Sequence, residues 1–243
     1  MLDILRTVTI GGTAGTLFAA VLTSLPIRLG SRLALGAGIG AWIALVVAIT
    51  ASGAVTGSPL VLPILFMLPL VAAGLAATSA VGRSAMMAIP APLIIALNAM
   101  RVLGVLMLFD AAAGRMSGPF PYSAGIGDVI TGLFALPVAR LAARNPRDVR
   151  VLGWNIFGTL DLIAAVSLAM ISANGSPLQF IHAGAGSTAI TTLPWALIPL
   201  VLVPTYLIGH ALVFAHVRAA ATAARPQEVK PFAKVGGVDP AGI

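Results

Sequence analysis

The chain has 243 residues, of which 59% are apolar and 9% are charged, and it contains no cysteine. A soluble domain carries about 25% charged residues, whereas the mean hydropathy here is +1.04. This composition excludes a soluble enzyme, a disordered chain and a disulfide-stabilised secreted scaffold. The net charge is +7, and most of the basic residues lie between apolar stretches. Basic residues at such positions set membrane topology, so we expect no nucleic-acid partner.

Seven apolar stretches are long enough to cross the hydrocarbon core of a bilayer, which takes about 20 helical residues. In chain order they cover residues 7–26, 33–52, 60–80, 88–109, 122–140, 152–172 and 190–217. Proline and glycine interrupt several of them, which membrane helices tolerate. We therefore predict an all-α polytopic membrane protein, with a seven-helix transmembrane domain over residues 1–218 and a flexible cytoplasmic tail over residues 219–243.

The distribution of basic residues predicts the orientation. Eleven Lys and Arg residues fall on one side of the predicted bundle, and only Arg6 and Arg115 fall on the other. Cytoplasmic loops carry the excess of positive charge. The prediction is therefore an external N-terminus and a cytoplasmic C-terminus, which an odd number of spans requires.

Three charged residues lie inside the predicted spans. Arg101 is in the fourth span, Asp128 in the fifth and Asp161 in the sixth, and at 1.5 Å rise per residue they share a depth of roughly 10–16 Å below the outer surface. One charge at mid-membrane costs about 2.5–3.5 kcal/mol on insertion scales, so Arg101 is expected to face at least one carboxylate. Asn98 lies one turn before Arg101 and Asn155 six residues before Asp161, and both complete the candidate set for ligand or ion handling.

One arginine between two ionised carboxylates leaves a net charge of −1, and a buried uncompensated carboxylate tends to hold a proton. Gly125 and Gly127 are expected to admit solvent beside Asp128, which would stay ionised and pair with Arg101. Asp161 would then be the protonated acid. Two alternatives stay open: the charges form a static ion pair that sets helix register, or Asp128 caps a helix that begins at that residue.

The remaining titratable residues do not predict a cofactor or a metal site. His182, His210 and His216 offer neither two haem ligands at one depth nor a zinc spacing, and His210 is expected to be a hydrogen-bonded packing residue. Both lysines, Lys230 and Lys234, lie in the tail, which excludes a retinal Schiff base inside the membrane.

Two resemblances add expectations. The string GIGD at 125–128 resembles the GxGD motif of intramembrane aspartyl proteases, which include the presenilin-like and prepilin-peptidase families, and implies a second aspartate that Asp161 could supply. In those families the partner precedes the GxGD helix, and an arginine at the same depth opposes a shared proton. The segments NAMRVLG, AGIGDVITG and WNIFGTLDL, within residues 95–165, resemble a motif set of small uncharacterised multi-span bacterial inner-membrane proteins. That resemblance implies a fold and a location, without an activity.

The leading interpretation is an inner-membrane protein that binds or transports a small solute or protons through a polar cavity, lined by spans four to seven and open to the outside. The alternative is a non-transporting membrane subunit or assembly partner with purely structural ion pairs, and a GxGD protease comes third. The expected partners are the lipid bilayer, a small solute or proton, and a protein in the same membrane. A water-accessible cavity at Arg101 would favour solute handling, and a dry, closed salt bridge would favour the structural role.

Overall fold

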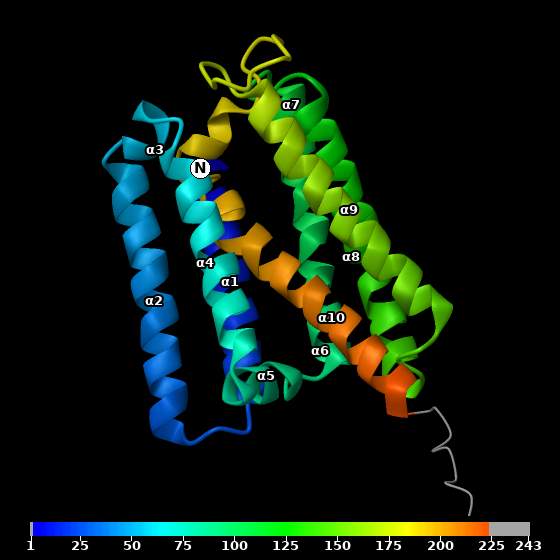
Figure 1. Ribbon diagram of the computed structural model, residues 1–243. Helices are drawn as coiled ribbons and strands as arrows, with labels where there is room; N and C mark the ends of the chain where they lie inside the picture. Colours follow the sequence, from blue (N-terminus) through cyan, green and yellow to red (C-terminus); the bar gives the residue numbers. More distant parts are fainter. Residues whose placement is uncertain (1, 224–243) are drawn as a thin grey trace, which may run out of the picture.

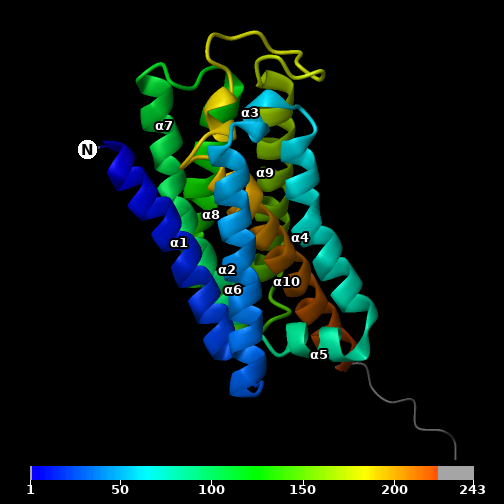
Figure 2. The same cartoon turned by 90° about the vertical axis from the view of Figure 1, so that its left-hand side faces the viewer.

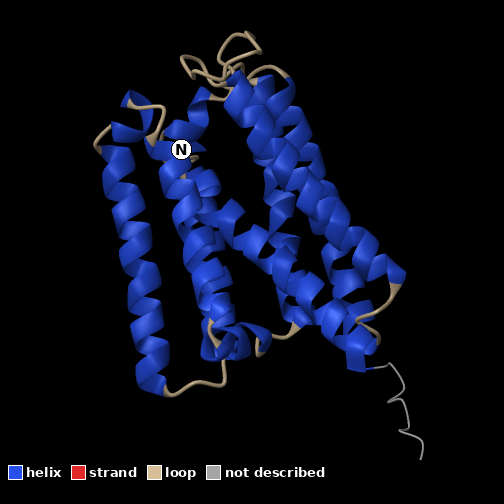
Figure 3. Ribbon diagram, in the orientation of Figure 1, coloured by secondary structure: helices blue, strands red, loops and turns tan. Residues whose placement is uncertain are grey.

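The computed structural model describes residues 2–223, and in this range helices and their connecting loops make up the whole chain (Figures 1 and 3). Seven segments are long and apolar enough to cross a membrane, as the sequence predicts. Residues 224–243, with most of the predicted tail and both lysines, lie outside the described residues. The helices are α1 (Leu2–Ser24), α2 (Leu29–Ala51), α3 (Ala54–Gly57), α4 (Val61–Thr78), α5 (Ala80–Met87), α6 (Ala91–Leu97), η1 (Asn98–Gly104), α7 (Val105–Ala112), α8 (Pro119–Arg144), α9 (Val149–Ser172), η2 (Thr188–Thr191), η3 (Ile198–Leu202) and α10 (Val203–Ala223).

The outer surface of the bundle is apolar. α2 and α4 stand at one edge in Figure 1 and bury few of their residues, while large side chains such as Leu33, Leu45, Ile64 and Val71 are exposed along them. A contiguous apolar surface of this kind is not compatible with water but suits lipid. The described chain therefore has the architecture of a multi-pass membrane protein.

Two of the membrane-spanning segments are not regular α-helices. The fourth is built from α6, η1 and α7, and the 3₁₀ turns of η1 lie in its middle. The seventh begins with the π-helix η3. Pro199 in η3 and Pro204 in the first turn of α10 each lack a backbone N–H to donate. The seventh segment starts at Ile198 and continues to Ala223, so it begins and ends later than the predicted stretch 190–217.

α8 is the central helix of the second half of the bundle, and η1, α7, α6 and α9 pack against it. α10 runs diagonally across the bundle in Figure 1 and contacts α9, α6 and α4. Figure 2 shows α1 inclined along one side of the bundle, next to α2. This arrangement brings η1, α8, α9 and α10 together around the middle of the fourth segment, where the charged residues lie.

Candidate functional site

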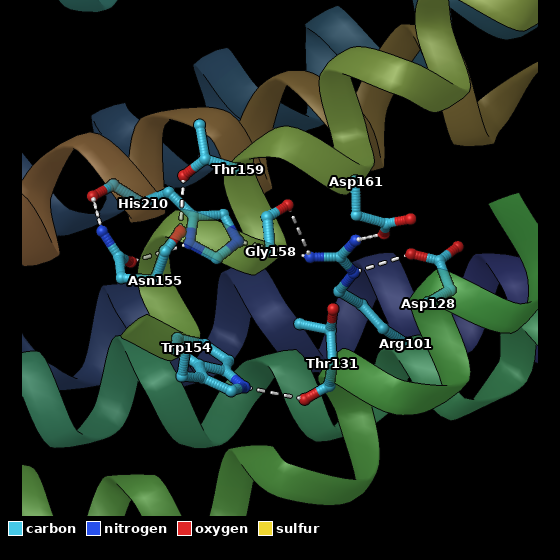
Figure 4. Close-up of polar contacts among 9 residues, drawn as sticks. All are labelled: Arg101, Asp128, Thr131, Trp154, Asn155, Gly158, Thr159, Asp161 and His210. Carbon is cyan, nitrogen blue, oxygen red and sulfur yellow. Dashed lines mark hydrogen bonds and ion pairs between the residues drawn. The ribbon is translucent and has the colours of Figure 1, made fainter. Parts of the chain in front are cut away.

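Arg101 lies at the centre of a buried polar cluster (Figure 4). It is 3% exposed in η1, and its Nε donates to Asp128 Oδ1 in α8 at 2.7 Å while its Nη2 donates to Asp161 Oδ2 in α9 at 2.5 Å. The expected pairing of Arg101 with a carboxylate is present. Both carboxylates bind the same guanidinium. The contacts therefore do not show the predicted difference between an Asp128 paired with Arg101 and an unpaired Asp161.

His210 is a third side chain that forms a hydrogen bond with Arg101. Arg101 Nη1 lies 3.2 Å from His210 Nε2, and His210 Nδ1 lies 2.8 Å from Asn155 Oδ1. The Asn155 amide also donates from Nδ2 to the His210 carbonyl at 3.1 Å. Since Asn155 Oδ1 can only accept, Nδ1 of His210 carries the proton and Nε2 accepts from Arg101. Neutral His210 is therefore part of the site, and Asn155 joins the site by orienting it.

Three glycines let the helices approach closely enough for these contacts. A Cβ atom at each of them would overlap a side chain of the cluster, so any larger residue would push the helices apart. Gly104 faces Asp128, Gly127 faces Asp161, and Gly158 faces His210.

The surroundings of Asp128 differ from the expectation in two ways. α8 begins at Pro119, so Asp128 lies well inside the helix, and the interpretation of Asp128 as a helix cap is wrong. Gly125 and Gly127 are buried and pack against neighbouring segments, so they do not admit solvent to the carboxylate. The Asp128 side chain is nevertheless 18% exposed, compared with 7% for Asp161.

Asn98 is buried but makes no direct contact with Arg101 among the hydrogen bonds of the described residues. Its Nδ2 donates to the carbonyl of Ile94 in the preceding turn at 3.0 Å, and its Oδ1 has no hydrogen-bond partner within residues 2–223. The structure therefore places Asn98 on the same segment as Arg101 but outside the contact network that the other four polar residues form.

A partly enclosed cavity of about 40 Å³ adjoins the cluster. One water molecule needs about 10–15 Å³ of cavity volume, so this cavity can hold about three waters. Its walls come from segments four to seven and also from α1, which was not predicted to take part. Most of the lining side chains are apolar, whereas the sequence predicts a polar cavity. Its lining residues include Ile10, Thr13, Arg101, Met107, Asp128, Trp195 and Tyr206.

Tyr206 is a further site residue, which is not among the candidates predicted from the sequence. Its ring centroid lies 5.6 Å from the Arg101 guanidinium carbon, within the range of a cation–π contact. The indole of Trp154 packs against His210, with 5.4 Å between the ring centroids, and donates to the Thr131 carbonyl at 3.0 Å. Aromatic rings thus contact both Arg101 and His210.

A second ion cluster, centred on the buried Asp110, ties α1 to the end of α7. Asp110 Oδ1 accepts from Arg6 Nη2 and from Arg115 Nη2, each at 2.5 Å. Sequence reasoning missed this site because the predicted fourth span ends at residue 109, which places Asp110 in a loop. A signal was available in the sequence. Arg6 and Arg115, the two basic residues predicted on the outer side, each lie next to the end of an apolar stretch, and Asp110 lies at the end of the stretch that precedes Arg115.

The described residues offer no metal centre: within residues 2–223, His, Asp and Glu side chains form no group of three that could hold a metal ion. The charged side chains of the main cluster are instead joined to each other by hydrogen bonds. The arrangement can hold or exchange a proton, because the arginine neutralises only one of the two carboxylates.

Residues 59–218 match the family described as "Domain of unknown function (DUF8737)". The chain belongs to this family. The matched range contains the whole Arg101 cluster, whereas α1 lies before it. No curated protein and no solved structure matches the chain.

The side chains that bind Arg101 by hydrogen bonds or by a cation–π contact all lie within the matched range. The residues that α1 adds, Thr13 and Ile10 in the cavity wall and Arg6 at Asp110, lie outside the matched range. In this chain the polar cluster thus lies within the matched range, and the cavity wall combines that range with the preceding helix.

Proposed function

We propose that this chain is a multi-pass protein of the bacterial cytoplasmic membrane that handles protons at the cluster of Arg101, Asp128 and Asp161. The observation that carries the proposal is that one buried guanidinium contacts two carboxylates. With both carboxylates ionised the cluster has a net charge of −1, and a site of low polarity favours the uptake of one proton to neutralise it. Intramembrane carboxylates in this setting are the usual components of proton relays.

The size of the cavity supports protons and water as the species handled. Its volume of about 40 Å³ is far below the roughly 300–1,000 Å³ of pockets that enclose a metabolite-sized ligand. A proton needs only hydrogen-bonded groups and a few waters to reach the carboxylates. The exposure of Asp128 next to this cavity makes it the entry point to the cluster.

A non-transporting membrane subunit is the second candidate, and the three glycines favour it. Side chains seated against Gly104, Gly127 and Gly158 lock four segments together, as a purely structural ion network would. A GxGD-type protease has less support, since Arg101 donates a hydrogen bond to each carboxylate, and a cation bound to both opposes the shared proton that a catalytic dyad needs.

Proton flux separates these candidates. The protein is reconstituted into liposomes that contain a pH-sensitive dye, and a potassium diffusion potential drives protons inward. We expect flux above that of protein-free liposomes, and loss of the excess in Asp128→Asn and in Asp161→Asn. The matched control is Asp148→Asn, because Asp148 also pairs with an arginine, at 2.8 Å, but at the end of α9. Flux equal to that of protein-free liposomes would refute proton handling and favour the structural subunit.

The proposed orientation has the N-terminus outside and the C-terminus in the cytoplasm. The charge asymmetry supports it, as do the described ends of the chain, which lie at opposite ends of the bundle (Figure 1). A reporter fused after Lys234 should read as cytoplasmic, and one inserted near Ser176, in the loop after α9, should read as external. The reverse signals at these two points would invert the topology.

A further inference from the structure

The hydroxyl group of Tyr206 is an unpaired polar group beside the Arg101 cluster. Tyr206 is 6% exposed in α10, and its hydroxyl has no hydrogen-bond partner among the described residues. A buried hydroxyl without a partner costs free energy, so buried polar groups are nearly always paired with protein or with ordered water. Residues 2–223 offer this hydroxyl no partner, although Tyr206 lines the cavity.

The cavity meets the physical requirements for holding water. Its volume is about 40 Å³, enough for about three molecules, and each buried water needs two to four polar partners. The polar side chains that line the cavity include those of Arg101, Asp128, Tyr206 and Thr13. Thr13 Oγ1 donates to the Thr9 carbonyl at 2.8 Å, which leaves its lone pairs available to accept from a water.

We infer that this cavity is a binding site for a small cluster of ordered waters, held between the Tyr206 hydroxyl, Thr13 and the Asp128 carboxylate. These waters carry protons to Asp128, and Tyr206 is a positioning residue that orients them. The role in proton delivery rests on the proposed function, but the presence of the waters does not.

Two buried methionines provide a direct test of hydration. Met107 is 2% exposed and lines the cavity, whereas Met116 is 1% exposed and is not among its lining residues. When X-rays generate hydroxyl radicals inside the intact protein in nanodiscs, side chains next to bound water are oxidised, and equally buried dry ones are not. Mass spectrometry should show Met107 oxidised several-fold faster than Met116. Equal, slow oxidation of both residues would show that the cavity is dry and would overturn the inference.

Tyr206→Phe tests the role of the hydroxyl. If the hydroxyl binds water, its removal lowers proton flux several-fold and leaves the melting temperature unchanged or lower. If it is unpaired in a dry cavity, its removal raises the melting temperature, which contradicts the inference. Thr131→Val is the matched control, because Thr131 Oγ1 is also buried and unpaired among the described residues but Thr131 does not line the cavity, so this change should raise the melting temperature.

The two experiments distinguish failure of the inference from failure of the proposed function. If the wild-type protein carries no proton flux but Met107 is oxidised selectively, the water site stands and proton handling is refuted. If flux is present and Tyr206→Phe leaves it unchanged, the assignment of Tyr206 as a positioning residue is overturned.

Discussion

Replacing Asp128 and Asp161 by Asn, singly and together, tests whether one arginine holds both carboxylates. Each single variant leaves Arg101 with one carboxylate, at 2.7 Å or at 2.5 Å. The asparagine oxygen at the changed position can still accept from the guanidinium. The double variant leaves Arg101, which is 3% exposed, without a counter-ion. We therefore expect two mild single effects and a severe combined effect.

The magnitudes follow from the burial of Arg101. A single change exchanges a charge-assisted hydrogen bond for a neutral one and brings the cluster to zero net charge, which costs about 1 kcal/mol of unfolding free energy. Additive effects would then sum to about 2 kcal/mol in the double variant. A buried charge without a partner costs about 3–5 kcal/mol instead. The expected coupling between the two positions is therefore about 1–3 kcal/mol.

Unfolding of the purified protein in mixed micelles, followed by tryptophan fluorescence, measures these free energies. Asp148→Asn is the control, since Asn caps a helix as well as Asp and this ion pair involves the exposed Arg150. Adding Arg101→Met to the double variant should restore most of the lost stability, because it removes the unpaired charge. A double variant whose cost equals the sum of the singles, or one that Arg101→Met does not rescue, would refute the shared arginine.

Three further predictions follow from other contacts. Gly158→Ala should destabilise the bundle by about 1–3 kcal/mol in the same unfolding assay, because its Cβ would overlap the His210 ring. The control is Gly153→Ala in the same helix, whose Cβ meets open space, so this change should be neutral or stabilising. Asp110→Asn should loosen α1 and so speed the alkylation of a Thr13→Cys thiol by a small neutral reagent. The chain has no native cysteine that would also react. An unchanged rate would show that α1 is held elsewhere. Hydrogen bonds from the Arg150 side chain and amide lower the pKa of Asp148 from 3.8 to about 2, so its contribution to stability should persist above pH 3.8 and be lost as the pH falls through about 2; an NMR titration midpoint near 3.8 would contradict this.

The membrane-spanning segments and the existence of an intramembrane ion pair could be predicted from the sequence because both depend on local composition. A run of about 20 apolar residues spans a bilayer whatever its neighbours are. A charge such as Arg101 inside such a run needs an opposite charge at the same depth, and Asp128 and Asp161 were the two available within the predicted spans. These arguments use position along the chain and depth alone.

The partners and the shape of the site depend on the packing of the helices. Gly127 and Gly158 allow close approach of neighbouring helices and so determine which helix faces turn inward. A sequence rich in glycine does not distinguish these two glycines from the other glycines. His210 enters the site from α10, and Thr13 enters the cavity wall from α1. Contacts between residues this far apart in the chain arise from rotation and tilt of whole helices, which side-chain packing determines. For that reason depth could be read from the sequence, whereas the side chains that meet at that depth could be identified only from the tertiary structure.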